Sequence, residues 1–406
     1  MKKLIALALC LVLCLSIFAG CSQNEETPAT NAPAAAGNEA APAAPAEEGG
    51  LNGTVKVGVL APITGNLAQY GTHFQTAMGM AVERVNAEGG INGKELILEF
   101  VDTAGDPTQS ADMCAQLAEN DEIVCVLGDF ASGCSLASGV IATEYEIVQF
   151  SPCSSNYAFN EISDWTFSIP GPTWEESSFS AQYVVQKYIG ADTAYVFYEN
   201  NDYANEGFGA FSSKAAEVGL EVVGSSTYPS GETTDFSAEI AKAKALNPDV
   251  VVMIDQNTTS LIVNQIRDSG WDVQLVNVGM NTSTKVIEDC GDKTEGMITS
   301  ACIFFDLSDE WTANWVEEYY ARANMSPVAM SAMSYDTIMI LAEALRKCGD
   351  EIDRAEVKDY LFQTDCEYMS GRIQFNEDGA ISRNYNICKV EDGVWVLKEG
   401  LDYANE

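Results

Sequence analysis

Histidine is almost absent from this chain of 406 residues, in which His73 is the only one. The count excludes metal sites with two histidine ligands and gives no support to histidine-based triads or proton shuttles. Neither the HExxH pattern of zinc hydrolases nor the GxSxG turn of serine hydrolases is present. We therefore expect no enzyme, no metal site and no cofactor. A secreted hydrolase that uses carboxylates remains as an alternative.

Positive charge is also scarce, with 21 Lys and Arg residues against 60 Asp and Glu residues and a formal net charge of −39. Nucleic acids and anionic membrane surfaces repel such a chain, so neither is expected as a partner. The acidity otherwise favours solubility and identifies no ligand.

Long hydrophobic runs are absent after the N-terminal region. There, Leu4–Ala19 is an apolar run too short to span a bilayer comfortably. It ends in Phe18-Ala-Gly-Cys21, which resembles the lipobox that precedes a lipid-modified cysteine. Residues 22–50 are mostly small or polar and bury too little surface to fold. We expect a lipoprotein signal peptide at 1–20 and a lipid-anchored disordered linker at 21–50, the alternative being an ordinary secretory signal with an incidental cysteine.

Cysteine pairing has no clear sequence signature after Cys21. Nine cysteines follow, an odd number without a C-x-x-C pair, and most have apolar neighbours. We interpret them mainly as small buried hydrophobic residues, with one or two disulfides left open. They are Cys114, Cys125, Cys134, Cys153, Cys290, Cys302, Cys348, Cys366 and Cys388.

The most informative passage is Val55–Pro107, which predicts a β-α-β-α unit. Its first strand is followed by a loop of small residues, and then by apolar residues at helical spacing: Phe74, Ala77, Met78, Ala81, Val82 and Val85. Leu96–Phe100 alternates as a second strand, and Asp106 and Pro107 are typical of a helix N-cap and first residue. In open α/β sheets, ligands bind at the carboxyl ends of the strands.

This passage resembles the leucine/isoleucine/valine-binding family of periplasmic-type solute receptors. The matching strings are Pro62-Ile-Thr-Gly65, Ala68-Gln-Tyr-Gly71, Val85-Asn-Ala-Glu-Gly-Gly-Ile-Asn-Gly93 and Asp102-Thr-Ala-Gly-Asp-Pro107. They occur in order and at the family's spacing, and the resemblance extends over about residues 52–398.

The resemblance implies an α/β fold of two Rossmann-like lobes, each a mostly parallel sheet flanked by helices, joined by a three-crossover hinge. Residues 51–170 and 306–372 would form lobe 1, and residues 171–305 and 373–406 would form lobe 2. The β/α alternation continues at 123–127, 147–151, 193–198, 221–227, 249–254, 273–278 and 296–303. We also expect Asn376–Gly379 to be the turn of a hairpin that joins Arg372–Phe375 to Ser382–Val390.

By resemblance, hydroxyl groups after the third and fourth strands hold the α-carboxylate and ammonium of the solute, and they map onto Ser132 and Ser155. Ala131 and Cys153 would contribute backbone contacts. From the residues alone, the two serines are equally well read as helix caps.

Two tyrosines match the family's cleft aromatics: Tyr70 in the first loop and Tyr203 in the second lobe. An aromatic ring in a cleft offers apolar contact and one hydroxyl group, although both rings could simply pack under loops. Met330 stands where the family often has an aromatic wall.

The chain departs from the family after the strand Val273–Val278, where an acidic residue usually pairs with the ammonium of the ligand. Here Val278-Gly-Met-Asn281 holds no carboxylate. Asp255 ends the neighbouring strand and could replace that counter-ion. It could equally be a solvated loop residue or the N-cap of the helix that starts near Thr258, and the solute would then lack an ammonium group.

Together these patterns predict an extracytoplasmic, lipid-anchored and monomeric binding protein that delivers a small amino acid, best a branched-chain or aliphatic one, to the permease of an ABC importer. The alternatives are a sensor of the same fold and a binder of amides, small carboxylic acids or aromatic acids. Whether the anchor lies at a cell surface or in a periplasm is left open.

Overall fold

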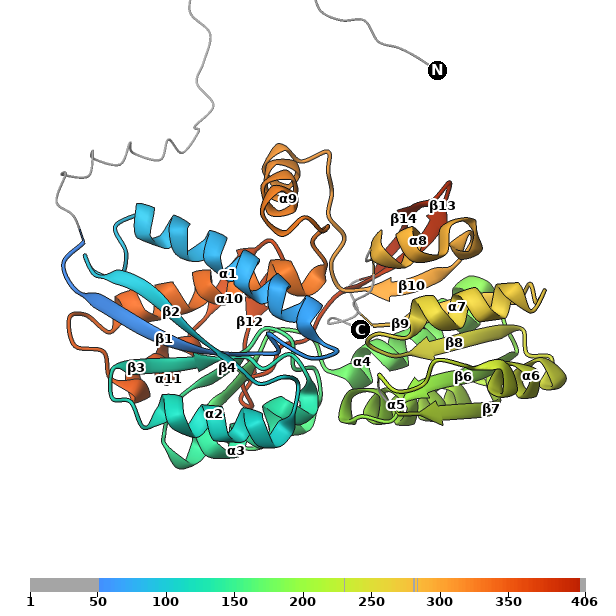
Figure 1. Ribbon diagram of the computed structural model, residues 1–406, viewed down its shortest axis with the longest axis horizontal. Coiled ribbons are helices and arrows are strands. Elements are labelled where there is room, and N and C mark those ends of the chain that lie inside the picture. The colour runs from blue at the N-terminus through green and yellow to red at the C-terminus, as the bar shows by residue number, and fades with distance from the viewer. Residues whose placement is uncertain (1–50, 230, 280–281, 283, 402–406) are drawn as a thin grey trace, which may run out of the picture. The chain divides into compact units, whose positions relative to one another are not determined.

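The computed structural model describes residues 51–229, 231–279, 282 and 284–401, with side chains described as far as residue 398. The predicted signal peptide, the lipidation site Cys21 and the linker 21–50 lie outside the described residues. The described part is an α/β fold with two large sheets flanked by helices, as the sequence predicted, and a small two-stranded sheet besides (Figure 1).

The first sheet has five parallel strands in the order β2-β1-β3-β4-β5. They are β1 (Thr54–Ala61), β2 (Glu95–Asp102), β3 (Ile123–Leu127), β4 (Gln149–Ser151) and β5 (Thr166–Ser168). The side chains of β1 and β3 are largely apolar and buried, because helices cover both faces of a parallel sheet, whereas the edge strand β2 buries only Leu96.

Helices pack in pairs on the two faces of this sheet. In Figure 1, α1 (Ala68–Ala87) and α10 (Ala329–Lys347) lie on one side, while α2 (Pro107–Ala118) and α3 (Ser132–Glu144) lie on the other. The remaining helices of this part are η1 (Tyr157–Phe159), α9 (Glu310–Ala323) and α11 (Arg354–Leu361). The expected start of α2 is confirmed, since the Asp106 side chain accepts a hydrogen bond from the Gln109 N–H at 2.8 Å.

The second sheet has seven strands in the order β14-β13-β10-β9-β8-β6-β7, and only the pairs formed by β13 are antiparallel. The strands are β6 (Thr193–Glu199), β7 (Glu221–Tyr228), β8 (Val250–Ile254), β9 (Gln274–Val278), β10 (Ile298–Ala301), β13 (Tyr385–Glu391) and β14 (Val394–Leu401). One apolar core lies against α4 (Thr173–Phe179), the π-helix η2 (Ser180–Ile189) and α5 (Asp202–Val218). A second core lies against α6 (Ser237–Leu246), α7 (Thr259–Asp268) and α8 (Thr284–Cys290), which the short η3 (Gly291–Thr294) follows.

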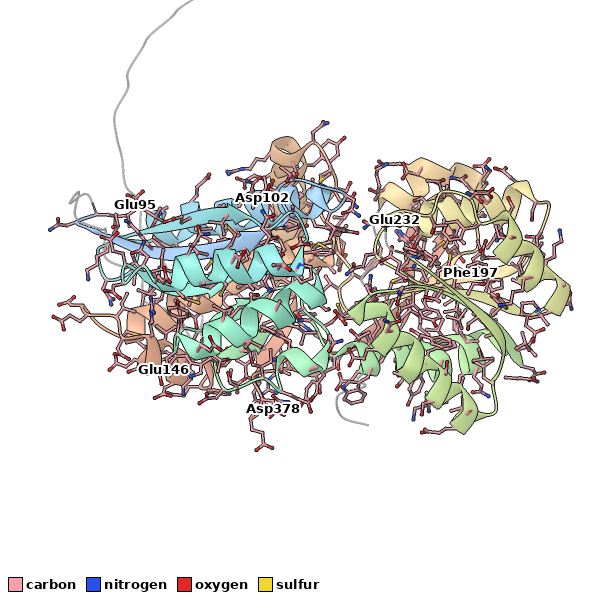
Figure 2. All side chains as sticks on the ribbon, turned by 60° about the horizontal axis from the view of Figure 1, so that its bottom comes forward. Glu95, Asp102, Glu146, Phe197, Glu232 and Asp378 are labelled. Atoms are coloured by element: carbon pink, nitrogen blue, oxygen red, sulfur yellow. The ribbon has the colours of Figure 1, made fainter. Side chains whose placement is uncertain are left out.

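The parallel strands of both sheets share one spatial order, because β2-β1-β3-β4-β5 corresponds to β7-β6-β8-β9-β10. Figure 2 shows how the first sheet is directed: Glu95 and Asp102 mark the two ends of β2, and Asp102 lies nearer to the second sheet. At this carboxyl edge, the Asp102 carboxylate accepts hydrogen bonds from the N–H groups of Ile63 and Thr64 at 2.9 and 3.1 Å. These bonds fix the loop that leads into α1.

The chain passes between the two lobes after β5, after β10 and after β12 (Gly371–Gln374). The predicted hairpin is wrong, because β12 pairs with β11 (Asp365–Tyr368), whereas β13 pairs with β10 and β14. Close to the crossings, the buried guanidinium of Arg383 donates to the Ile169 carbonyl at 2.8 Å and to the carbonyl of Ser370. The lobe boundaries given above stay predictions.

All nine cysteines of the described part are free thiols, and six of them are buried. Burial raises the pKa of the Cys114 thiol to about 12 and that of Cys348 to about 11. Within the described residues, no helix is both long and apolar enough to cross a membrane.

Candidate functional site

A small pocket of about 40 Å³ brings together most of the residues that the sequence singled out. Seven of them line it: Tyr70, Ser132, Cys153, Ser155, Tyr203, Asp255 and Met330. The eighth, Ala131, directly precedes Ser132 as the N-cap residue of α3 and does not line the pocket. Their roles in binding stay predictions, but their convergence from two lobes onto one pocket is a property of the fold.

Three further lining residues were not predicted: Phe130, Gln256 and Gly279. Each stands next to a residue or loop that the sequence analysis had named. The sequence therefore identified the loops but not these three residues. Gly279 has φ of +131°, and a Cβ atom there would lie 2.7 Å from the Tyr203 hydroxyl oxygen. Only glycine fits this backbone conformation and this close approach.

The start of α3 forms one wall of the pocket. Ala131 cannot cap a helix with its side chain, so the first N–H groups of α3 have no side-chain acceptor. Ser132 is 3% exposed, and its hydroxyl has no hydrogen-bond partner among the described residues. This wall therefore offers unused hydrogen-bond donors and the positive end of a helix dipole.

The loop after β4 is held in place by Ser151. Its hydroxyl donates to the Asp129 carbonyl at 2.9 Å and accepts from the N–H groups of Cys153 and Ser154 at 3.2 and 2.8 Å. Further along, the Ser155 carbonyl accepts a hydrogen bond from a backbone N–H of α4 at 2.7 Å. The loop therefore connects the first sheet to the helix that begins the second lobe.

Tyr70 lies in the first turn of α1, where the sequence had suggested a loop. Its ring stacks on Phe130 with centroids 3.8 Å apart and an angle of 12° between the planes. Its hydroxyl donates to the backbone carbonyl of Gln256, which follows β8 in the second sheet. Burial raises the pKa of the Tyr70 phenol far above its usual range, so this hydroxyl keeps its proton.

Two more hydrogen bonds join the lobes across the cleft. The Gln69 side-chain amide donates to Asn257 Oδ1 at 3.1 Å, and the Asn156 side-chain amide donates to the Asp202 carbonyl at 3.0 Å. The loops at the two sheet edges are thus in direct contact, and the pocket lies between closed lobes.

Tyr203 and Met330 complete the walls from opposite lobes. Tyr203 belongs to the first turn of α5, and its hydroxyl donates to the Val278 carbonyl at 3.3 Å. Met330 is the second residue of α10 and is 6% exposed. Together with the rings of Tyr70 and Phe130, these side chains give the pocket an apolar lining.

Asp255 is both a helix cap and a pocket-lining residue. Its Oδ1 accepts hydrogen bonds from the N–H groups of Thr258 and Thr259, each at 2.9 Å, and Thr259 Oγ1 lies 2.8 Å from its Oδ2. The residue is 2% exposed, so it is not a solvated loop residue. Burial, together with the nearby carboxylate of Glu199, raises the pKa of the Asp255 carboxyl group.

A further buried carboxylate supports the same side of the pocket. Glu176 of α4 accepts hydrogen bonds through Oε1 from the Gly279 N–H at 3.2 Å and from the Ser300 hydroxyl at 3.0 Å. Burial raises the pKa of Glu176 to about 7. Neither Asp255 nor Glu176 forms an ion pair with a Lys or Arg of the described residues, so the second-lobe side of the pocket carries acidic groups without a protein counter-ion.

Among the described residues, no group of three or more His, Cys, Asp or Glu side chains is arranged to hold a metal ion. The chemistry of the pocket is therefore that of hydrogen-bond donors on one side, carboxyl groups on the other, and aromatic and thioether surface between them.

Comparison with known sequences gives a match over nearly the whole described part. The sequence profile of the periplasmic binding protein family matches residues 54–394. A Leu/Ile/Val-binding protein homologue from Brucella abortus is 25% identical over 327 residues, which cover 80% of this chain and 87% of the relative.

Solved structures show the same fold. A branched-chain amino acid transporter substrate binding protein from Streptococcus pneumoniae, in complex with isoleucine, superposes with a TM-score of 0.78 at 24% identity, covering 86% of this chain and 99% of that one. A solute binding protein from Rhodopseudomonas palustris, in complex with 3,4-dihydroxybenzoic acid, gives a TM-score of 0.80 at 20% identity, with 86% and 98% covered.

Proposed function

This chain belongs to the periplasmic binding protein family, and we propose that it captures a small amino acid between its lobes for an ABC importer. The observation that carries the proposal is the polarity of the pocket. One lobe contributes an uncapped helix start and the unpartnered hydroxyl of Ser132, whereas the other contributes the carboxyl group of Asp255. An α-amino acid presents the complementary pair of charges.

The α-carboxylate would bind at the start of α3. The free N–H groups there and the Ser132 hydroxyl can donate hydrogen bonds to it, and the helix dipole favours a negative charge. Ser155 borders the same side of the pocket, although its hydroxyl already accepts a bond from Thr173 Oγ1 at 2.8 Å.

The α-ammonium would pair with Asp255. Capping α7 occupies Oδ1 with two backbone N–H groups, while Oδ2 receives only the Thr259 hydroxyl and keeps room for a further donor. A buried ammonium without a counter-ion is costly, so Asp255 supplies what the loop after β9 lacks. The cap and counter-ion roles are compatible.

The carbon skeleton of the ligand would lie on Tyr70, Tyr203, Cys153 and Met330. These groups suit an aliphatic side chain, in keeping with the names of the relatives. Affinity near micromolar, about −8 kcal/mol, is ordinary for a site of this kind.

A second candidate is an aromatic or small carboxylic acid. It is favoured by the stacked rings of Tyr70 and Phe130 and by the raised pKa of Asp255, because a protonated carboxyl group needs no ammonium partner. The Rhodopseudomonas palustris relative was solved with a compound of this class.

Beyond the pocket, we propose that the chain acts as a monomer outside the cytoplasmic membrane, anchored through a lipid on Cys21, and delivers its solute to a membrane permease. These parts of the proposal rest on the N-terminal sequence and on the family. A sensor of the same fold that passes a signal to another protein is the alternative.

Thermal unfolding of the purified protein against a ligand panel tests the proposal. A ligand at a hundred times its dissociation constant adds about 2.7 kcal/mol to the free energy of unfolding. We expect a shift with leucine, isoleucine or valine that Asp255→Asn abolishes. Shifts only with benzoate-type acids would overturn the amino-acid assignment.

The matched control is Asp309→Asn. Asp309 caps α9 through bonds of 2.8 Å to the N–H and hydroxyl of Thr312, so its loss weakens a cap as Asp255→Asn does, but outside the pocket. It should lower the midpoint of unfolding without changing the ligand-induced shift. Equal loss of the shift in both variants would show that capping alone explains the effect of Asp255→Asn.

A further inference from the structure

A larger cavity of about 150 Å³ adjoins the pocket and shares Tyr70 and Gln256 with it. It extends from α1 in the first lobe towards α7 and α8 in the second. The pocket itself, at about 40 Å³ of space for the centres of water molecules, holds only about three of them, since each needs about 10–15 Å³ of such space. A whole amino acid therefore needs the space that the second cavity provides.

The wall of this cavity includes Asn277, the one interior residue of β9 that is not apolar. Asn277 is fully buried, and its Nδ2 donates to Thr259 Oγ1 at 2.9 Å. Its Oδ1 is buried without a hydrogen-bond partner among the described residues. An unpaired buried acceptor destabilises the folded state, and a chain tolerates it where something else satisfies it.

The bonds around Thr259 fix which end of the Asn277 amide is free. The Thr259 hydroxyl has one proton, and it donates that proton to the Asp255 carboxylate. Towards Asn277 the Thr259 hydroxyl can only accept. Asn277 therefore directs Nδ2 to Thr259, and its Oδ1 is left without a partner. The chain Asp255–Thr259–Asn277 thereby links the pocket to an unused acceptor on the wall of the second cavity.

The other side chains of this wall are mostly uncharged and polar. They include Gln69, Ser260 and Asn257, whose Nδ2 is also buried without a partner. The charged side chains on the wall belong to α8: Lys285 and Asp289 form an ion pair with each other, and Glu288 is exposed. The unpaired carbonyl oxygen of Asn277 and the unpaired amide nitrogen of Asn257 complement a primary amide, because a primary amide has one NH₂ donor group and one carbonyl acceptor.

We propose that the second cavity holds the end of the ligand's side chain, and that Asn277 selects an amino acid whose side chain ends in a primary amide, of the glutamine type. The inference rests on the proposed function and narrows it. The methylene groups of such a side chain pass Tyr70, its amide N–H donates to Asn277 Oδ1, and its carbonyl accepts from Asn257 Nδ2.

Isothermal titration of the purified protein with glutamine, glutamate and norleucine tests this. Glutamate has the shape of glutamine without the amide donor, and norleucine has an apolar end. We expect glutamine to bind at least about tenfold more tightly than either. Asn277→Leu should remove the preference over norleucine.

Thr299→Val is the matched control, because Thr299 Oγ1 bonds to the Asn277 carbonyl at 3.1 Å and lines neither cavity. Any effect it has on affinity should be equal for all three ligands. Equal weakening of all three by Asn277→Leu, or wild-type binding of norleucine as tight as that of glutamine, would overturn the inference and leave the proposed function intact. Binding of no amino acid at all would overturn both.

Discussion

The hydroxyl group of Tyr70 donates a hydrogen bond to the backbone carbonyl of Gln256, and this bond joins the two lobes at the wall of the pocket. Tyr70 is positioned for it by the first turn of α1 and by stacking on Phe130. The same ring therefore contacts the candidate ligand space and holds the lobes together. On the proposed function, closure and binding would be coupled through this one side chain.

Tyr70→Phe tests this coupling. The variant keeps the ring and its stacking but lacks the hydroxyl, so the closed arrangement loses one interlobe bond, worth about 1 kcal/mol. We expect a several-fold weaker affinity for any ligand that binds, and a more open unliganded protein in small-angle X-ray scattering.

Tyr145→Phe is the control for Tyr70→Phe. It also removes a hydroxyl bond, at 3.0 Å to Glu119 Oε1, but this bond lies within the first lobe and Tyr145 lines neither cavity. Unchanged scattering and affinity in Tyr70→Phe would show that the bond does not contribute to closure.

Ligand affinity should depend on pH through Asp255. Its raised pKa means that the empty pocket holds a proton at mildly acidic pH, with the nearby carboxylate of Glu199 reinforcing this. An ammonium can pair with Asp255 only after that proton leaves, so affinity for an amino acid should rise by at most tenfold per pH unit from about pH 5.5 to 8 and then level off.

Titration calorimetry in buffers of different ionisation enthalpy would detect the released proton directly. Asp255→Asn should bind weakly and without this pH dependence. A carboxylic acid without an amine should show no such rise, and a flat profile for an amino acid would contradict the pairing with Asp255.

Stability should fall in acid because of His73. This side chain is buried, its Nδ1 lies 2.5 Å from the Tyr319 hydroxyl oxygen, and burial lowers its pKa to about 4 from 6.5. Between these values the unfolded chain binds a proton that the folded chain does not. The contribution of neutral His73 to the free energy of unfolding is therefore complete above about pH 6.5. It falls by about 3 kcal/mol as the pH falls towards 4.

His73→Gln should remove that part of the pH dependence. Urea unfolding of both proteins at pH 7 and pH 4.5 gives the four free energies needed. If the difference between the two proteins is the same at both pH values, His73 does not titrate as its burial implies.

Arg383 should be important for stability, because its buried guanidinium joins segments on both sides of the hinge. Arg383→Met leaves the carbonyls of Ile169 and Ser370 without their donor, at a cost of about 3 kcal/mol. Arg372→Met is the control, since Arg372 pairs with Asp365 on the surface and should cost below about 1 kcal/mol. Equal urea midpoints for Arg383→Met and Arg372→Met would contradict this role of Arg383.

Local sequence signals predicted local structure well. The Asp106 cap and Pro107 at the start of α2 were correct because a cap depends on residues only three positions apart. The pairing of β12 was predicted wrongly because strand partners are chosen by tertiary packing, and β11 lies closer in the chain than β13. The start of α1 was placed too late because small and polar residues weaken the helical pattern there.

The candidate site was predictable where side chains carry the signal, and less so where the backbone does. Ser132 and Tyr203 were recognised through the family resemblance and Asp255 by its place at the end of a strand, and all three line one pocket. The Gln256 carbonyl contributes through its backbone, which no residue pattern reveals. The Asn277 acceptor was also missed, since its significance depends on which neighbour satisfies Thr259.

The low reactivity of the native thiols makes the protein suitable for site-specific labelling at introduced cysteines. Because burial raises the pKa of Cys302 to about 12 and raises the pKa of the other eight as well, they react slowly with maleimides at neutral pH. Cysteines introduced at the exposed positions Glu95 and Glu232, one on each lobe (Figure 2), would react first. A pair of fluorophores there would report lobe movement in real time, with the nine native cysteines of the described residues left in place.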